Sequence, residues 1–239
     1  MRMAALPSFT GVSPPASSAL PSPPFLSRIL KLAIDTHSWC PPGRRSAGIQ
    51  APRERKAKGE REMNLWHDIR PARMQPEDFL AVIEIEKGSK NKYELDKETG
   101  ALRLDRILYT STHYPANYGF IPRTYADDGD PLDVLVLCSE PIRPMSLVRV
   151  YPVGYFTMRD GGAMDDKILA IPYEDPMYNS YQDLGELPAH ISDEISHFFS
   201  VYKHLEPDKN AEVDSVHGRK EAVEVIRRAF DAYVEKFCR

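Results

Sequence analysis

The sequence predicts an α+β fold in which a small, mainly β barrel is followed by two main α-helices. Short apolar segments separated by Gly, Pro and Asp fill residues 79–171, a spacing typical of a small barrel. Apolar residues recur at helical spacing in the last third of the chain. The composition, 42% hydrophobic and 28% charged, is ordinary for a soluble protein, and no run approaches the ~18 apolar residues of a membrane span.

The predicted strands begin at the apolar segment Phe79–Ile85. Lys92–Asp96 alternates polar and apolar residues, and the turn at Glu98–Ala101 predicts a hairpin with Leu102–Ile107. Three further segments are predicted strands: Asp133–Cys138, Leu147–Phe156 and Lys167–Ile171.

Two helices are predicted after Pro188. The first carries Ile191, Ile195, Phe198 and Tyr202 at helical spacing; the second carries Val223, Ile226, Phe230, Val234 and Phe237. Each pattern gives one apolar face, so the helices are expected to cover the open side of the barrel.

The chain divides at residue 62 into an N-terminal extension, 1–62, and a folded domain, 63–239. The extension holds nine of the 21 prolines and lacks helix or strand periodicity over most of its length, so we expect it to be disordered. A basic, Ser-rich, acid-poor N-terminus is typical of an organelle transit peptide, but a start site placed too early, with the true start at Met63, explains it equally well.

Charge is distributed unevenly between these parts. The extension holds 10 of the 31 Lys and Arg residues and 4 of the 35 Asp and Glu residues, so residues 63–239 carry a net charge of −10. An acidic body argues against nucleic acid as the main partner. The three cysteines, Cys40, Cys138 and Cys238, are far apart and odd in number, which favours a reducing compartment over a disulfide framework.

Residues 127–133, Asp-Asp-Gly-Asp-Pro-Leu-Asp, place four carboxylates in one tight turn before an apolar strand. Carboxylates this close repel one another unless a cation lies among them. Hard oxygen ligands on a rigid turn suit Mg²⁺ or Mn²⁺. Taken alone, such a turn is more often a solvated hairpin, so the metal interpretation needs further residues.

A second acidic segment with Asp160 and Asp165 also lies between predicted strands, so the two segments could converge on a site for more than one divalent ion. Basic and phenolic side chains elsewhere could bind phosphate oxygens: Lys92, Arg106, Tyr118, Lys167, Tyr202 and Lys203. Each has a plain structural alternative, such as an exposed face of an edge strand for Lys92 or barrel packing for Tyr118.

Taken jointly, these segments resemble the soluble inorganic pyrophosphatases of the single-domain, Mg²⁺-dependent family, of bacterial or plant type. The family signature D-[SGDN]-D-[PE]-[LIVMF]-D is met by Asp128–Asp133, and the resemblance extends from Pro76 to the C-terminus. The flanking matches, in chain order, are Lys92-Tyr-Glu94, Asp105-Arg106, Tyr114-Pro-x-Asn-Tyr118-Gly, Asp160-x-Gly-x-x-Asp165-x-Lys167 and His197-Phe-Phe-x-x-Tyr202-Lys203.

The resemblance implies a role for each matching residue. Asp128, Asp133, Asp160, Asp165 and Glu94 would hold several Mg²⁺ ions. Asp130 would accept a proton from the metal-bound water, and Glu84 would be a supporting acid. Diphosphate would be bound by the basic and phenolic set, namely Lys92, Arg106, Tyr118, Lys167, Tyr202 and Lys203.

The resemblance also implies a five-stranded OB-like β-barrel and Mg²⁺-dependent hydrolysis of inorganic diphosphate to two orthophosphates. It implies a homo-oligomer, a hexamer if the protein is bacterial-like, with no nucleic-acid or membrane partner. We expect a cytoplasmic protein, or one of the plastid or mitochondrial matrix if residues 1–62 are a transit peptide. Gly161, Ala163 and Met164 depart from the residues common in relatives, and Arg159 could compete with an ion at Asp160.

Two rival interpretations come from other classes of protein. Small barrels often bind single-stranded nucleic acid, but such a barrel needs a basic groove with exposed aromatic residues, and this body is acidic. A catalytically inactive relative would be indicated by loss of Asp130, Asp133 or Lys92, and all three are present.

Overall fold

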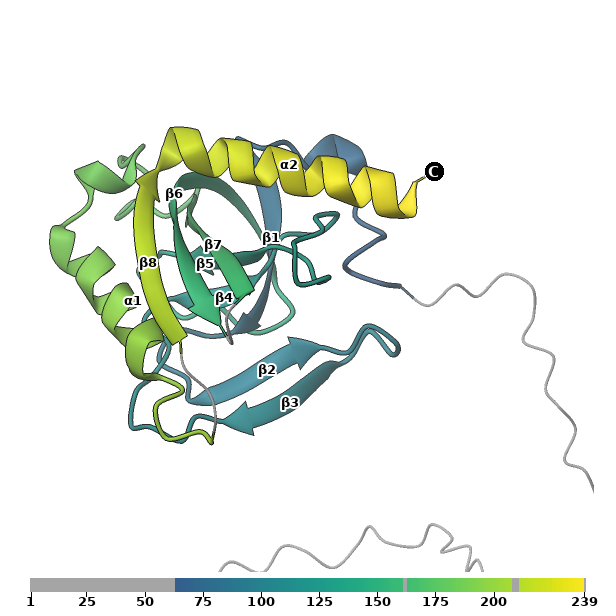
Figure 1. The fold of residues 1–239 in the computed structure, drawn as a ribbon. Helices are drawn as coiled ribbons and strands as arrows, with labels where there is room; N and C mark the ends of the chain where they lie inside the picture. The colour runs from purple at the N-terminus through teal and green to yellow at the C-terminus, as the bar shows by residue number, and fades with distance from the viewer. Residues whose placement is uncertain (1–62, 161–162, 208–210, 239) are drawn as a thin grey trace, which may run out of the picture. The chain divides into compact units, whose positions relative to one another are not determined.

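Residues 63–160, 163–207 and 211–238 are described by the structure, a computed structural model, so the predictions made for residues 1–62 lie outside it. The described chain forms strands in its first part and helices mainly in its last part (Figure 1). In chain order the elements are η1 (Pro71–Arg73), β1 (Phe79–Ile85), β2 (Asn91–Leu95), β3 (Leu102–Ile107), β4 (Asn117–Phe120), β5 (Asp133–Val136), β6 (Leu147–Asp160), β7 (Ala163–Pro172), η2 (Leu184–Glu186), α1 (Ala189–Val201), β8 (Ala211–Gly218) and α2 (Arg219–Phe237).

Five strands close into a barrel. The order of hydrogen-bonded neighbours is β1-β4-β5-β7-β6, and β6 pairs again with β1 through Leu147–Val150 and Phe79–Val82. Because this closure leaves no free edge within the ring, the barrel is a rigid support for the loops at its ends. The predicted five-stranded OB-like barrel is confirmed.

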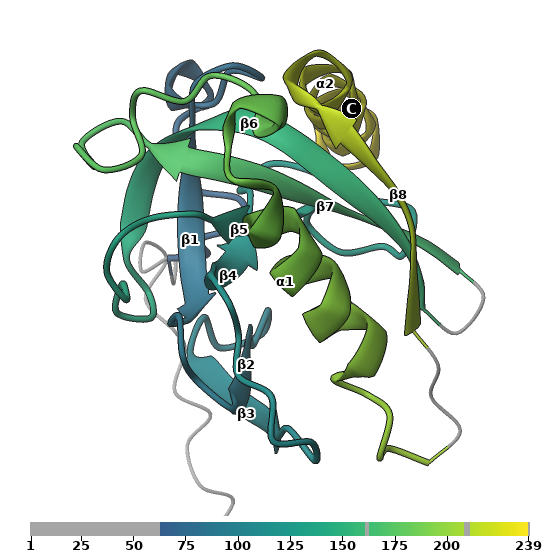
Figure 2. The same ribbon diagram turned by 90° about the vertical axis from the view of Figure 1, so that its left-hand side faces the viewer.

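The core lies on both faces of the barrel strands. In β5, Val134 and Val136 pack in a cluster with Ala222 and Ile226 of α2, whereas Leu135 joins a second cluster with Phe199 of α1. A strand buried on both faces has a continuous apolar sequence rather than an alternating one, which explains the apolar run after the acidic turn. The two helices cover different sides of the barrel (Figure 2).

Strands β4 and β8 were not predicted from the sequence. Strand β4 is the short segment Asn-Tyr-Gly-Phe, which has no alternation, and it is a strand because it pairs with β1 and β5. Strand β8 alternates residues such as Val213 with exposed polar ones, and it pairs with the outer half of β6. Strand β6 continues to Asp160 rather than ending at Phe156. Tertiary pairing therefore determines both strands.

The hairpin β2–β3 forms a separate two-stranded sheet beside the barrel (Figure 1). Its turn ends at Gly100, whose φ of +68° favours glycine. The buried Glu84 of β1 holds the hairpin, because its Oε1 accepts a hydrogen bond from the backbone N of Leu95 at 2.6 Å. No helix in the described part of the chain is both long and apolar enough to cross a membrane.

Gly119 of β4 lies where β4 and β1 approach each other closely, so a substitution there tests this pairing. A Cβ at this position would lie 1.8 Å from the carbonyl oxygen of Val82, which is backbone and cannot rotate away. We expect Gly119→Ala to lower the free energy of unfolding by at least about 3 kcal/mol, the upper end of the overpacking range. Urea denaturation measures the change. Gly185→Ala is the control, because its Cβ would meet only an ordinary contact at 3.4 Å; equal stability of both variants would contradict the close pairing of β4 with β1.

Candidate active site

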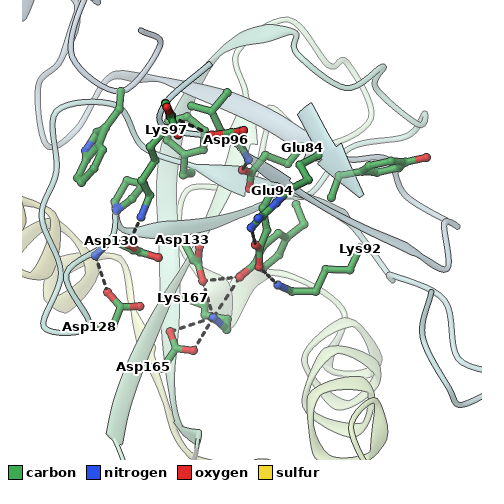
Figure 3. Close-up of a pocket in the computed structure, with 18 of the residues that line it drawn as sticks. Glu84, Lys92, Glu94, Asp96, Lys97, Asp128, Asp130, Asp133, Asp165 and Lys167 are labelled. Carbon is green, nitrogen blue, oxygen red and sulfur yellow. Dashed lines mark hydrogen bonds and ion pairs between the residues drawn. The ribbon is translucent and has the colours of Figure 1, made fainter. Parts of the chain in front are cut away.

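A pocket of about 540 Å³ lies where the barrel faces the hairpin β2–β3 and the end of α1. Figure 3 shows the acidic turn, β7 and the hairpin pointing side chains into it. Eleven of the thirteen predicted site residues line this pocket: Glu84, Lys92, Glu94, Tyr118, Asp128, Asp130, Asp133, Asp165, Lys167, Tyr202 and Lys203. Arg106 is not part of the lining, and the side chain of Asp160 lies outside the described part of the chain.

The parallel pairing of β5 with β7 brings the two acidic segments together. Asp133, the first residue of β5, is the register partner of Lys167. The Lys167 Nζ lies 2.6 Å from Asp133 Oδ2 and 2.8 and 2.9 Å from the two carboxylate oxygens of Asp165 (Figure 3). Segments about 30 residues apart in the chain therefore meet at one ammonium group.

This ammonium group is almost fully buried, with 3% of the Lys167 side chain exposed. Burial alone would lower the pKa of Lys167, but the carboxylates of Asp133 and Asp165 outweigh it and hold that pKa above its ordinary value. Burial raises the pKa of Asp165, and Lys167 opposes that rise. Lys167 therefore stays charged and offsets the repulsion between the two carboxylates.

Tyr118 of β4 completes this centre. Its hydroxyl donates a short hydrogen bond to Asp133 and lies 3.2 Å from the Lys167 Nζ. Burial raises the pKa of Tyr118 well above its ordinary value, so the hydroxyl remains a donor at neutral pH. The Lys167 Nζ also lies 5.5 Å from the centre of the Tyr118 ring, a cation–π distance.

The acidic turn supplies Asp128 and Asp130 to the same pocket. Gly129 has a φ of +88°, and the Asp128 Oδ1 accepts a hydrogen bond from the backbone N of Asp130 at 2.9 Å. The Asp130 carboxylate forms a short ion pair with Lys97 of the hairpin turn. The Lys97 Nζ also lies 5.2 Å from the ring centre of the buried Trp66.

The hairpin supplies Lys92 and Glu94. The Lys92 Nζ forms a short ion pair with Glu94 and lies 3.3 Å from Asp105 Oδ2 (Figure 3 labels Lys92 and Glu94). Glu84 lies behind these residues, and burial raises the pKa of its carboxyl to about 8, which the hydrogen bond from Leu95 only partly offsets. Glu84 is therefore protonated at neutral pH.

The end of α1 supplies Tyr202 and Lys203, both of which are buried and line the pocket. The Lys203 Nζ lies 5.4 Å from the centre of the Tyr202 ring. Arg106 of β3 lies beside this wall, and its Nε donates a hydrogen bond to Glu206 Oε1 at 2.7 Å. The pocket therefore combines a carboxylate wall with cations and hydroxyls on the facing side.

Carboxylate oxygens are the donors that Mg²⁺ and Mn²⁺ prefer, so the donor chemistry of Asp128, Asp133 and Asp165 fits a hard divalent cation. Among the described residues, no three His, Cys, Asp or Glu side chains are already gathered as a metal-binding group. Asp133 and Asp165 are turned toward Lys167 instead. Binding a cation would require these carboxylates to share their oxygens between Lys167 and the ion.

Four residues of this region were not predicted from the sequence: Trp66, Lys97, Asp105 in its pairing role, and Glu206. Lys97 follows the strand that carries Lys92 and Glu94, but nothing in its local pattern relates it to Asp130, which is 33 residues away. Glu206 follows the Tyr202–Lys203 pair by a few residues, and this proximity was the one available signal.

Comparisons with known proteins agree with one another. The family model described as inorganic pyrophosphatase matches residues 81–234. An inorganic pyrophosphatase of Aquifex pyrophilus is 46% identical over 170 residues, which cover 70% of this chain and 96% of that protein. The soluble inorganic pyrophosphatase 2 of Chlamydomonas reinhardtii is 47% identical, covering 72% of this chain and 89% of that protein. The crystal structure of the inorganic pyrophosphatase of Thermus thermophilus matches with a TM-score of 0.69 and 41% identity, covering 72% of this chain and 99% of that chain.

The buried carboxyl of Glu84 predicts a pH dependence of stability. Its pKa is about 8 in the folded chain against an ordinary value of 4.5. Between these values the folded state holds a proton that the unfolded state releases, so the contribution of Glu84 to stability is lost as the pH rises from 4.5 through 8. Each unit of pKa difference corresponds to about 1.4 kcal/mol.

We expect Glu84→Gln to flatten this decline, because the amide carries no titrating proton and its oxygen can still accept from Leu95. Urea unfolding at several pH values between about 5 and 8, with a chelator present, measures the slopes. Glu86→Gln, at an exposed neighbouring position, should keep the slope of the unmodified protein. Parallel curves for Glu84→Gln and the unmodified protein would argue against a protonated Glu84.

Proposed function

The chain belongs to the inorganic pyrophosphatase family, and from this premise we propose that it hydrolyses inorganic diphosphate to two orthophosphates in a reaction that requires Mg²⁺. The members that it resembles are hydrolases by name. The single observation that best supports the proposal is the convergence of both acidic segments on Lys167, in a pocket whose facing wall carries Lys92, Tyr202 and Lys203. The carboxylates suit metal ions, the facing cations suit a polyanionic substrate, and the reaction requires both in one cavity.

We assign the carboxylates of Asp128, Asp133 and Asp165 to the metal ions, with Asp160 and Glu94 completing the set. Bound divalent ions supply an acidified water and neutralise charge on the phosphate oxygens. Asp130 would accept the proton of the attacking water, since its carboxylate is in the acidic turn and lines the same pocket. Lys97 of the hairpin turn forms an ion pair with this carboxylate and so holds it in place.

The substrate is bound by the other half of the pocket. Lys92 and Lys203 supply positive charge to the two phosphate groups, and the Tyr202 hydroxyl donates a hydrogen bond. Lys167 and Tyr118 act from within the carboxylate wall, where they fix Asp133. Arg106 lies next to the residues that line the pocket, and its hydrogen bond to Glu206 holds the edge of the pocket in place. As negative charge develops on the leaving phosphate, this fixed positive wall stabilises it.

We further propose a homo-oligomer, a hexamer if the protein is bacterial-like, that works in the cytoplasm. The free thiols of Cys138 and Cys238 support a reducing compartment. The net negative charge of residues 63–239 argues against binding of nucleic acid. The plastid or mitochondrial matrix is the alternative if residues 1–62 act as a transit peptide.

Orthophosphate release from diphosphate, with and without Mg²⁺, tests the function and the role of Asp130. We expect release by the unmodified protein only when Mg²⁺ is present. Asp130→Asn should lower kcat by about 10²- to 10⁴-fold, because the amide cannot accept the proton of the attacking water. The variant keeps the shape of the turn, so its melting temperature should change little.

Asp127→Asn is the matched control, since Asp127 is exposed in the same turn and does not line the pocket. Its turnover should equal that of the unmodified protein. Metal-independent release would reject the proposed chemistry, whereas near-normal turnover of Asp130→Asn would reject only the role assigned to Asp130.

A further inference from the structure

A buried carboxylate next to the pocket, Glu206, has no part in the chemistry proposed above. It follows α1, and 3% of its side chain is exposed. Its Oε1 accepts a hydrogen bond from Arg106 Nε at 2.7 Å, and its backbone N donates to the carbonyl oxygen of Lys203 at 2.8 Å. Glu206 therefore contacts the hairpin through its side chain and the end of α1 through its backbone.

From Glu206 a row of alternating charges leads into the pocket. Arg106 Nη1 donates to Asp105 Oδ2, and the same oxygen lies 3.3 Å from the Nζ of Lys92. Lys92 lines the pocket, whereas Arg106 does not. Asp105 therefore joins Lys92 to Arg106, and Arg106 joins this pair to Glu206.

The energetics favour an orienting role over a stabilising one. A buried ion pair is weak evidence for stability, because removing both charges from water costs about as much as their attraction returns. The orientation of Arg106 is nevertheless fixed, because its flat guanidinium group bonds to Glu206 through Nε and to Asp105 through Nη1. The Arg106–Glu206 pair joins β3 to the segment after α1. Arg106 is the register partner of Lys92 on β2, so the pair links the hairpin wall to the wall that carries Tyr202 and Lys203.

We propose that Glu206 is a positioning residue for the substrate: through Arg106 it holds the hairpin against the end of α1 and sets the distance between Lys92 and Lys203. This inference rests on the proposed function, since it assigns these cations to the two phosphate groups. Without Glu206, Arg106 loses its buried partner and the hairpin loses its ion pair to the segment after α1. The distance between Lys92 on the hairpin and Lys203 is then no longer fixed. Substrate binding weakens as a result, while the carboxylate wall around Lys167 is unchanged.

Glu206→Gln, Arg106→Gln and the double variant form the test. The readouts are kcat and KM for diphosphate at saturating Mg²⁺, and the affinity for methylenediphosphonate, an unreactive diphosphate analogue, measured by calorimetry. We expect Glu206→Gln to raise KM and weaken analogue binding by about tenfold, within the range for interacting residues, with a smaller change in kcat. In the Arg106→Gln background, Glu206→Gln should add no further loss, because its partner is already absent.

Asp175→Asn is the matched control for loss of a buried carboxylate. Asp175 is similarly buried and accepts hydrogen bonds from the backbone N of Ser139 at 2.7 Å and of Met177 at 2.9 Å, and it does not line the pocket. We expect this variant to melt at a lower temperature and to keep its KM. Glu206→Asp, which keeps the charge but shortens the side chain, should raise KM less than Glu206→Gln and should decide the question if the Gln variant does not fold.

An unchanged KM and analogue affinity in the Glu206 variants would overturn the inference, as would losses that add fully to those of Arg106→Gln. If the unmodified protein releases no orthophosphate with Mg²⁺, the proposed function fails and this inference fails with it. If the unmodified protein is active and the Glu206 variants bind as it does, the inference alone fails.

Discussion

The site depends on one buried interaction, the ammonium group of Lys167 between the carboxylates of Asp133 and Asp165. Two carboxylates held close together would repel each other, and a buried ammonium group alone would lose its charge. The positive charge of Lys167 offsets the repulsion between the carboxylates, and the carboxylates keep Lys167 charged. This is possible because the parallel register of β5 and β7 places Lys167 beside Asp133. Closure of the barrel keeps that register fixed, so the fold itself brings together the two acidic segments that the chemistry requires.

The rest of the pocket is arranged around this centre from less rigid parts. The hairpin β2–β3 lies outside the barrel sheet and is held by the hydrogen bond from Leu95 to Glu84 and by the Lys97–Asp130 ion pair. The end of α1 forms the opposite wall. The carboxylate wall thus belongs to the barrel, and the phosphate-binding wall is built from segments attached to it (Figure 3). Such a division allows substrate binding to be tuned while Asp133 and Asp165 stay in place around Lys167.

Much of this arrangement follows from local sequence patterns. The apolar run after the acidic turn and the helical spacing of Ile195 and Phe198 predict elements that the structure contains. Strand β8 was missed because its core-facing apolar residues are only Ala211 and Val213, and pairing with β6 fixes the strand in the sheet. The pairing of Lys97 with Asp130, and of Arg106 with Glu206, joins residues 33 and 100 positions apart. No local pattern encodes such contacts, because they exist only once the hairpin and α1 are packed on the barrel.

The central claim is that the carboxylates arranged around Lys167 bind the divalent ions used in catalysis. Anomalous diffraction from crystals soaked with Mn²⁺ and methylenediphosphonate tests it most directly, because it locates the ions without relying on activity. We expect Mn²⁺ peaks in the pocket at roughly 2.0–2.6 Å from the carboxylate oxygens of Asp128, Asp133 and Asp165, the range for hard cations. Well-ordered Mn²⁺ bound elsewhere, with these three carboxylates in contact only with Lys167 and water, would contradict the account.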